Sequence, residues 1–264
     1  MIARVAAPAG ALMLRDLRAF SRSRSQLYSS LLFPLMLLAV LGAGVQEGLN
    51  PTLIRDGDYV SFLVPGMMVM TAVFSSTFSS ASYYQDRDTG MLRTFLATPN
   101  SPWAIMLGKS LSGVLIGSAQ ALAVALVASL VPAVHLSWQY GVGVGLLTAV
   151  AGVLLLNLLL SGVAQVLASR IRTMSGFHLV MNLALFPALF FSGAFYPLVH
   201  LPRWLEVLGW LNPLSFGVDL LHVAMYADTP AGYFGLGVDF AVLTTLSVVV
   251  YAWGLSRHAR EGER

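Results

Sequence analysis

Four side chains of metal-binding type lie within a short stretch of the sequence. They are His200, Glu206, Asp219 and His222, and the last two are spaced i and i+3. A zinc site needs three or four such ligands held in a fixed tetrahedral geometry. The spacing here defines no such geometry. We therefore interpret these residues as solvated edges and helix caps and predict no metal site.

A second short motif has the chemistry of nucleotide binding. Gly108-Lys109-Ser110 resembles the end of a P-loop, whose backbone amides and lysine cradle phosphates. A P-loop also needs an earlier glycine, and that position holds Trp103. No strand precedes the motif. We therefore expect this chain to bind no ATP and to carry no catalytic residues.

Charged residues are absent from the centres of the long apolar segments. Lys109 and Asp239 lie near segment borders, where a long side chain can snorkel or water can enter. His178 is the strongest buried ionisable candidate. The remaining polar candidates are amides, which more often form hydrogen bonds between helices than bind substrate: Gln120, Asn157, Gln165 and Asn182. Ion-coupled transporters usually need intramembrane carboxylates, so we expect another polypeptide to supply the energy.

The composition identifies an integral membrane protein. Of 264 residues, 57% are hydrophobic and only 10% are charged, and the mean hydropathy is +0.75. Soluble domains carry roughly a quarter charged residues. The chain has no cysteine, which excludes disulfides and thiolate sites. The pI of about 9.4 is basic, but in a membrane protein the position of the basic residues relative to the bilayer is more informative than their number. We expect no nucleic-acid partner.

The apolar segments predict an all-α polytopic fold, in a single transmembrane domain over residues 1–264. A helix needs about 20 apolar residues to cross a bilayer. Six segments meet this length, and we expect each to span: 27–45, 61–83, 103–131, 141–168, 174–196 and 236–255.

Basic residues predict the orientation of these spans. All but Arg55 and Arg203 of the 15 Lys and Arg fall on one side of the predicted membrane. The positive-inside rule then places both termini in the cytoplasm of a multi-pass protein, which we expect in the bacterial inner membrane.

Residues 8–26 predict an amphipathic helix at the membrane interface. Met13, Leu17 and Phe20 fall on one side of this helix. The other side carries the basic residues Arg15, Arg18 and Arg22. Such a helix lies in the interface with its basic face toward lipid phosphates. A positive-inside anchor with no partner explains the same residues equally well.

Residues 85–102 (QDRDTGMLRTFLATPNSP) form a charged, Gly- and Pro-punctuated segment between two apolar ones. Asp86 and Asp88 fall at the start of a predicted short helix and Arg93 nearer its end, as the helix dipole favours. Thr98-Pro99 then ends it. A small helix at the cytoplasmic surface suggests a docking point for another protein, made by Asp86, Arg87, Asp88, Thr89, Gly90, Met91, Leu92 and Arg93.

Residues 197–222 are too polar to span and too apolar for a free loop. Apolar residues recur at helical spacing on both sides of Asn212-Pro213. They are Leu201, Leu205 and Leu208 before it, and Leu214, Val218 and Leu221 after it. We predict two short helices that dip back from the outer surface, with protein covering their broken backbone.

These regions together resemble the permease subunits of type-2 ATP-binding-cassette exporters. Asp86-Arg87-Asp88, Gly90, Leu92, Leu96 and Thr98-Pro99 are similar to that family's cytoplasmic coupling helix. The run from Phe191 through Tyr196-Pro197 to Asn212-Pro213-Leu214 is similar to its outer re-entrant region, although His222 stands where many relatives carry arginine. The resemblance covers essentially the whole chain and is closest to the drug-resistance (daunorubicin-type) and nodulation-factor-type subgroup.

The resemblance implies one half of a permease. Two such subunits pair, here as an expected homodimer, and each docks a cytoplasmic ATPase subunit that carries ATP-Mg, so that this chain itself needs no cofactor. The cargo is then an amphipathic, lipid-like or drug-like molecule moved out of the cytoplasm or inner leaflet. A secondary transporter and a polytopic membrane enzyme remain as alternatives.

Two predicted spans carry Met- and aromatic-rich faces that suit such a cargo. The candidate pathway-lining residues are Met67, Met70, Phe74, Phe78, Phe190 and Phe191. Ordinary core packing and contact with lipid explain any one of these residues equally well.

Overall fold

The computed structural model describes residues 2–46, 59–91, 102–198, 201–226 and 233–261. Within these ranges the chain is helical and contains no strand, which confirms the predicted all-α class. The helices are α1 (Ile2–Arg22), α2 (Arg24–Gln46), α3 (Tyr59–Asp88), α5 (Pro102–Ser129), α6 (Gly141–Arg170), α7 (Met174–Phe190), α8 (Arg203–Leu211), α9 (Pro213–Met225) and α10 (Leu236–Glu261).

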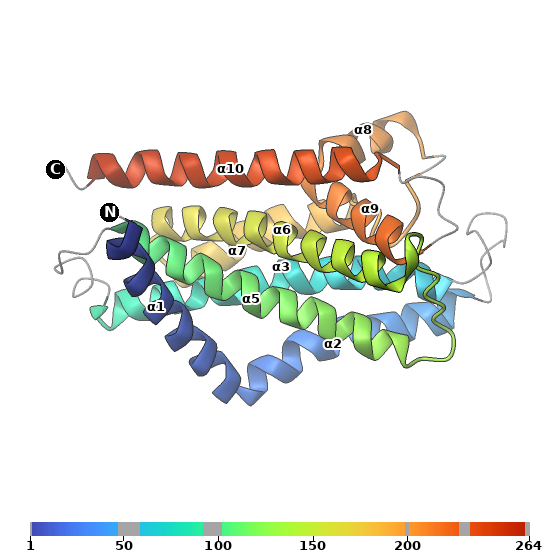
Figure 1. Cartoon of the computed structure of the whole chain (residues 1–264), viewed down its shortest axis with the longest axis horizontal. Coiled ribbons are helices and arrows are strands. Elements are labelled where there is room, and N and C mark those ends of the chain that lie inside the picture. The colour runs from blue at the N-terminus through green and yellow to red at the C-terminus, as the bar shows by residue number, and fades with distance from the viewer. Residues whose placement is uncertain (1, 47–58, 92–101, 199–200, 227–232, 262–264) are drawn as a thin grey trace.

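The long helices run side by side in one bundle (Figure 1). Helix α3 lies in the middle, packed against α2, α5 and α6, and its residues Leu63, Val64 and Met67 are fully buried. Both labelled termini lie at one end of the bundle, and α8 and α9 lie near the other end. Helices α3 and α5 therefore pack closely along each other and reach the terminal end of the bundle.

A glycine on α5 allows α3, α5 and α6 to approach closely. A Cβ atom at Gly117 would lie 2.1 Å from Oδ1 of Asn157 on α6 and 3.1 Å from Oγ of Ser75 on α3. This small residue therefore allows close packing of three helices of one chain.

Each of the six predicted spans corresponds to a helix, but not all of them meet the length of a full crossing. Within the described residues, four helical segments are long and apolar enough by themselves: Tyr59–Asp88, Ala104–Ser129, Gly141–Arg170 and Leu236–Gly254. The apolar part of α2, Ser30–Gly42, and α7 are shorter. The structure thus supports a membrane protein, and the number of six spans stays a prediction.

Helices α8 and α9 confirm the two short helices predicted within residues 197–222. They meet at an angle of 88° at Asn212, and α9 continues to Met225. The Asn212 side chain caps α9 by accepting a hydrogen bond from the Leu214 amide, and it donates one to the carbonyl of Ala188. The corner is therefore fixed to α7, while His200 lies outside the described residues.

Helix α1 differs from the predicted interface helix 8–26 in its bounds and its inward face. It starts at Ile2 and ends at Arg22, and α2 begins directly after Ser23. Ala9, Leu12 and Asp16 are buried, whereas Met13, Leu17 and Phe20 are only partly buried. The cause is close packing on α5, where a Cβ at Gly108 would lie 2.7 Å from the Ala9 carbonyl oxygen.

Candidate functional site

The start of the predicted docking segment belongs to a long helix. Helix α3 continues to Asp88, so Asp86 and Asp88 lie in its last turn and do not begin a separate short helix. Thr89 and Gly90 form the turn that follows, with Gly90 at a φ of +74°. This corrects the predicted boundary, and Leu92 and Arg93 lie outside the described residues.

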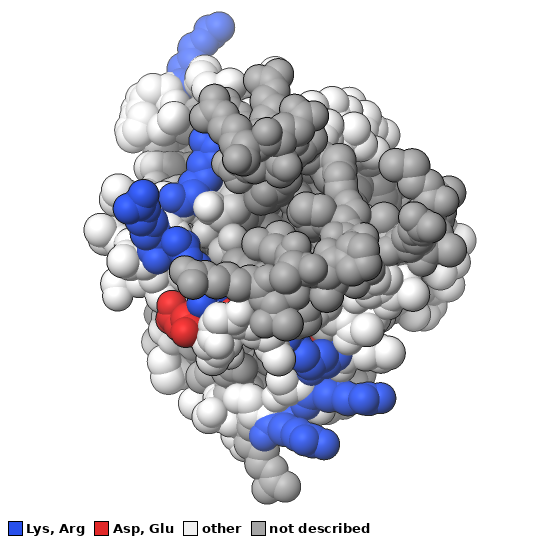
Figure 2. Space-filling model, turned by 90° about the vertical axis from the view of Figure 1, so that its left-hand side faces the viewer, with Lys and Arg blue, Asp and Glu red and all other residues white. Residues whose placement is uncertain are grey.

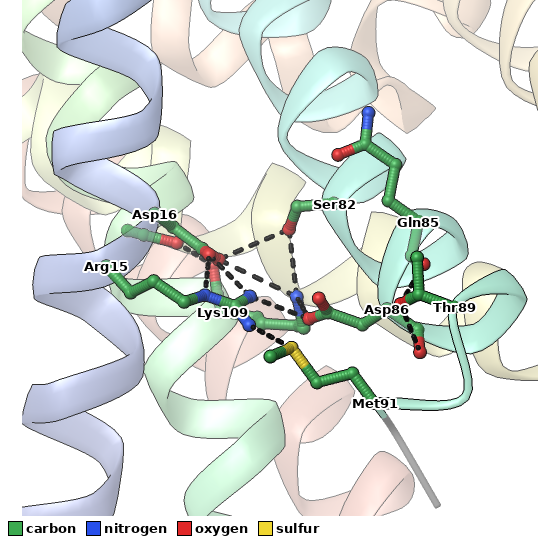
Figure 3. Close-up of polar contacts among 9 residues, drawn as sticks. Arg15, Asp16, Ser82, Gln85, Asp86, Thr89, Met91 and Lys109 are labelled. Atoms are coloured by element: carbon green, nitrogen blue, oxygen red, sulfur yellow. Dashed lines mark hydrogen bonds and ion pairs between the residues drawn. The ribbon is translucent and has the colours of Figure 1, made fainter.

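Acidic side chains in the last turn of a helix oppose its dipole, so cations must compensate them. Two cations from other helices do this for Asp86 (Figure 3). Lys109 Nζ on α5 lies 2.6 Å from Asp86 Oδ2, and Arg15 Nη2 on α1 lies 2.7 Å from the same oxygen. The carboxylate therefore ties the end of α3 to both α1 and α5.

A second carboxylate completes this group. Asp16 Oδ1 lies 2.7 Å from Arg15 Nη2, and its Oδ2 lies 3.6 Å from Lys109 Nζ. Ser82 links the two halves, because it accepts a hydrogen bond from Lys109 at 2.9 Å and donates one to Asp16 at 3.2 Å. We call Arg15, Asp16, Asp86 and Lys109 the ion cluster.

The ion cluster is largely withdrawn from solvent. The side chain of Lys109 is fully buried, and those of Asp16 and Asp86 are 7% and 10% exposed. Buried charges are tolerated only when they are paired and hydrogen-bonded, and here two cations balance two carboxylates. Burial alone would lower the pKa of Arg15, but its hydrogen bonds to Asp86 and Asp16 raise that pKa above its ordinary value.

Two sequence-based assignments are corrected by this geometry. Lys109 does not snorkel to a border, because its ammonium finds two carboxylates inside the protein. Arg15 does not share a phosphate-facing surface with Arg18 and Arg22, which are exposed, since it turns toward Asp86. Asp16 had no assigned role. The sequence feature that could have identified it is its position: Asp16 is the one acidic residue within residues 2–22, and it follows the apolar Leu12 by four positions, on the same side of the helix.

Beside the ion cluster, a set of exposed residues forms what we call the docking surface: Arg87, Asp88, Thr89 and Met91. Met91 is 45% exposed, and its sulfur lies 3.2 Å from Arg15 Nη1. Figure 2 shows this end of the molecule, where Lys and Arg side chains predominate over Asp and Glu. The ion cluster thus lies directly behind a mixed polar and apolar surface.

The described members of the predicted pathway-lining set differ in their burial and contacts. Met67 and Met70 are buried in the core. Phe74 packs edge-on against Phe33 and Phe186, with ring centroids 5.8 and 5.7 Å apart. Farther along the chain, Phe190 is 53% exposed and contacts Phe195, while Phe191 is half-buried. The side chain of Phe78 lies outside the described residues.

The metal-type residues have other partners. Within the part of the chain that the structure describes, no three His, Asp or Glu side chains gather as metal ligands would. Asp219 accepts hydrogen bonds from the amides of Tyr233 and Phe234, and Glu206 accepts one from the Tyr233 hydroxyl. The His222 ring packs between Phe62 and Tyr226.

Comparison with known proteins gives a consistent result over most of the chain. The model of the family described as ABC-2 type transporter matches residues 9–226, which include the ion cluster and the α8–α9 corner. The chain is 26% identical to the "Probable multidrug ABC transporter permease YbhR" of Escherichia coli K12, over 81% of this chain and 55% of that protein. It is 28% identical to nodulation protein J of Bradyrhizobium diazoefficiens, over 77% of each. The chain therefore spans about half the length of YbhR.

Proposed function

The chain belongs to the ABC-2 type transporter family, and on that premise we propose that it is the membrane-spanning subunit of an ATP-driven exporter. Its relatives and its apolar helices indicate a permease component for membrane transport. The names of the relatives favour a transporter over an enzyme. The energy source, the cargo and the partners belong to the proposal.

The ion cluster is the observation that carries the proposal. It joins the last turn of α3, directly before the docking surface, to α1 and α5. An ATPase subunit bound at the docking surface would displace the end of α3 when it binds ATP. Because buried ion pairs are costly to break, α1 and α5 would follow that movement as one body.

The remaining partners follow from the same arrangement. We infer that ATP-Mg is bound by the ATPase, that two permease and two ATPase subunits assemble, and that the permease pair is a homodimer. The concentration of basic side chains at the terminal end supports a cytoplasmic location of that end in a bacterial inner membrane. Aromatic groups such as Phe33, Phe74 and Phe186 suit an amphipathic, lipid-like or drug-like cargo.

The first test is co-purification of the ATPase with the tagged chain. The double variant Arg87→Glu/Asp88→Lys reverses two exposed charges of the docking surface and changes no residue of the ion cluster. We expect the bound ATPase, measured by its stoichiometry and ATP hydrolysis, to fall about tenfold or more, as loss of central contacts in an interface produces. Asp86 is unsuitable for this test, because a lysine there would lie against the buried Lys109.

The matched control is Arg203→Glu, which reverses an exposed charge on α8 at the other end of the bundle. It should retain the ATPase. If the docking-surface variant also retains a full complement of ATPase while remaining folded, the docking assignment is wrong.

A further inference from the structure

A cleft of about 570 Å³ opens beside the ion cluster and is not explained by ATPase docking. It lies between α1 and α2, with α3 and α5 forming its floor; in Figure 1 these two N-terminal helices diverge as a V. Half of its lining side chains carry hydroxyl or amide groups: Ser23, Ser25, Ser30, Ser75, Ser82, Gln85 and Gln120. Its size is within the usual range for small-molecule sites.

The inner part of the cleft offers hydrogen bonds without a free charge. The charged lining residues are Arg15, Asp16 and Asp86, and all three are already paired within the ion cluster. An ion bound there would lose its hydration without gaining an unpaired counter-charge. The lining therefore favours a neutral group that both donates and accepts hydrogen bonds.

Two buried polar atoms in this lining are unsatisfied. The Gln120 amide nitrogen donates to Ser30, but its Oε1 has no hydrogen-bond partner among the described residues. The same holds for Oγ of Ser75. These residues are only 4% and 2% exposed, and such buried polar atoms are normally paired with protein, water or ligand. Hydroxyl groups of a ligand in the cleft are the kind of partner that these two atoms lack.

The borders of the cleft add two further chemistries. Arg18 and Arg22 are exposed and lie on α1 next to the lining face that contains Arg15, Ala19 and Ser23. Along α2, exposed apolar side chains recur every three or four residues and form a stripe that starts beside the cleft: Tyr28, Leu32, Phe33, Met36 and Val40. The neutral interior of the cleft suits the hydroxyl groups of a polyol headgroup. The cationic border suits a phosphate, and the apolar stripe suits an acyl chain, so one lipid would match all three.

We propose that this cleft binds a phospholipid with a polyol headgroup, of the phosphatidylglycerol type. The glycerol hydroxyls bind Gln120 and Ser75, the phosphate lies against Arg18 and Arg22, and an acyl chain covers the stripe on α2. This lipid would anchor α1 to the inner leaflet. The proposal does not depend on an ATPase partner, so it stands or fails separately from the exporter function.

Native mass spectrometry of the full-length chain tests the proposal. The chain is taken from bilayers with equal amounts of phosphatidylglycerol and phosphatidylcholine, since phosphatidylcholine carries the phosphate but has no headgroup hydroxyl. We expect retained phosphatidylglycerol to exceed phosphatidylcholine roughly fivefold or more, and Gln120→Leu or Ser75→Ala to remove most of that preference, as loss of one buried hydrogen bond predicts.

The exposed double variant Arg18→Gln/Arg22→Gln gives a second measurement that does not alter the core. It should weaken retention of both lipids, whereas Arg203→Gln and the exposed Ser129→Ala should not. Equal retention of the two lipids by the unmodified chain would overturn the proposal. Displacement of the lipid by soluble glycerol phosphate would also overturn it, because the ligand would then be a free phosphate ester. A dimer without bound lipid would overturn it as well, because a second copy of the chain would then cover α2.

Discussion

At the residue scale, the end of α3 shows how a charge that opposes its helix dipole becomes a point of attachment. Asp86 stays in the last turn because Arg15 and Lys109 approach it from two other helices. The same pairing removes Lys109 from water entirely. Each member of the ion cluster therefore depends on the others, and loss of one leaves a buried charge without its partner.

Lys109→Met should accordingly be strongly destabilising. Breaking a buried ion pair by removing one partner costs about 3–5 kcal/mol, because the remaining carboxylates stay buried. The measurement is thermal unfolding in detergent, followed by size-exclusion chromatography with fluorescence detection. Arg22→Met, at an exposed position of α1, should shift stability by less than about 0.5 kcal/mol.

A double variant separates charge from packing at the same place. Lys109→Met/Asp86→Asn removes one charge of each sign, so it should recover part of the lost stability. If Lys109→Met alone unfolds at the temperature of the unmodified chain, the ion cluster does not hold α3 to α5.

At the element scale, close contacts between helices decide which small residues matter. Gly117 is one of several glycines in the apolar segments, but the Asn157 side chain lies directly over it. The Asn157 nitrogen donates to the Val153 carbonyl of its own helix, so its oxygen points toward α5. Of the predicted interhelical amides, Gln120 does join two helices through Ser30, whereas Asn157 bonds within α6.

Gly117→Ala should therefore destabilise the bundle. The new Cβ would lie 2.1 Å from Asn157 Oδ1, and overpacking of this kind costs about 1–3 kcal/mol. Gly143→Ala on α6 is the control, since nothing lies within 4 Å of its added Cβ and alanine favours a helix. In thermal unfolding, Gly117→Ala should have a lower midpoint temperature than the unmodified chain, and Gly143→Ala should have the same or a higher one. A tolerated Gly117→Ala would mean that α5 and α6 can separate without cost.

At the scale of the whole molecule, both termini and the ion cluster lie at one end of the bundle, and α8 lies near the other end. The cysteine-free chain makes this polarity measurable. In intact cells, Arg203→Cys on α8 should react with an impermeant maleimide, and Arg18→Cys should react only after the membrane is opened. The reverse pattern would invert the proposed orientation.

Transport itself is a property of the assembly. We expect the purified chain alone in liposomes to move no cargo under a proton or sodium gradient, and transport to require the ATPase and hydrolysable ATP. The physical reason is that a remote nucleotide can shift the permease between states only through differential binding. Gradient-driven transport without the ATPase would falsify the exporter proposal in favour of a secondary transporter.

The fold class, the helices and the family could all be predicted from local features of the amino-acid sequence. Long apolar segments must be helical in lipid because their backbone groups have no other partners, so the helices could be predicted from composition and length. Asn212-Pro213 marked the corner between α8 and α9, because an Asn-Pro pair ends one helix and begins the next. These are local properties, and each depends on residues that are near one another in the chain.

The partners of the polar residues became known from the packing of the helices and could not be predicted from the sequence. Asp16, Asp86 and Lys109 are far apart in the sequence, and nothing in their local context shows that three helices bring them together. Charge order near Asp86 predicted a helix start, yet long-range pairing made the same residue a helix end. The cleft between α1 and α2 likewise depends on how these helices diverge. A buried ion pair or a cleft is formed by distant segments, so local sequence periodicity does not encode it.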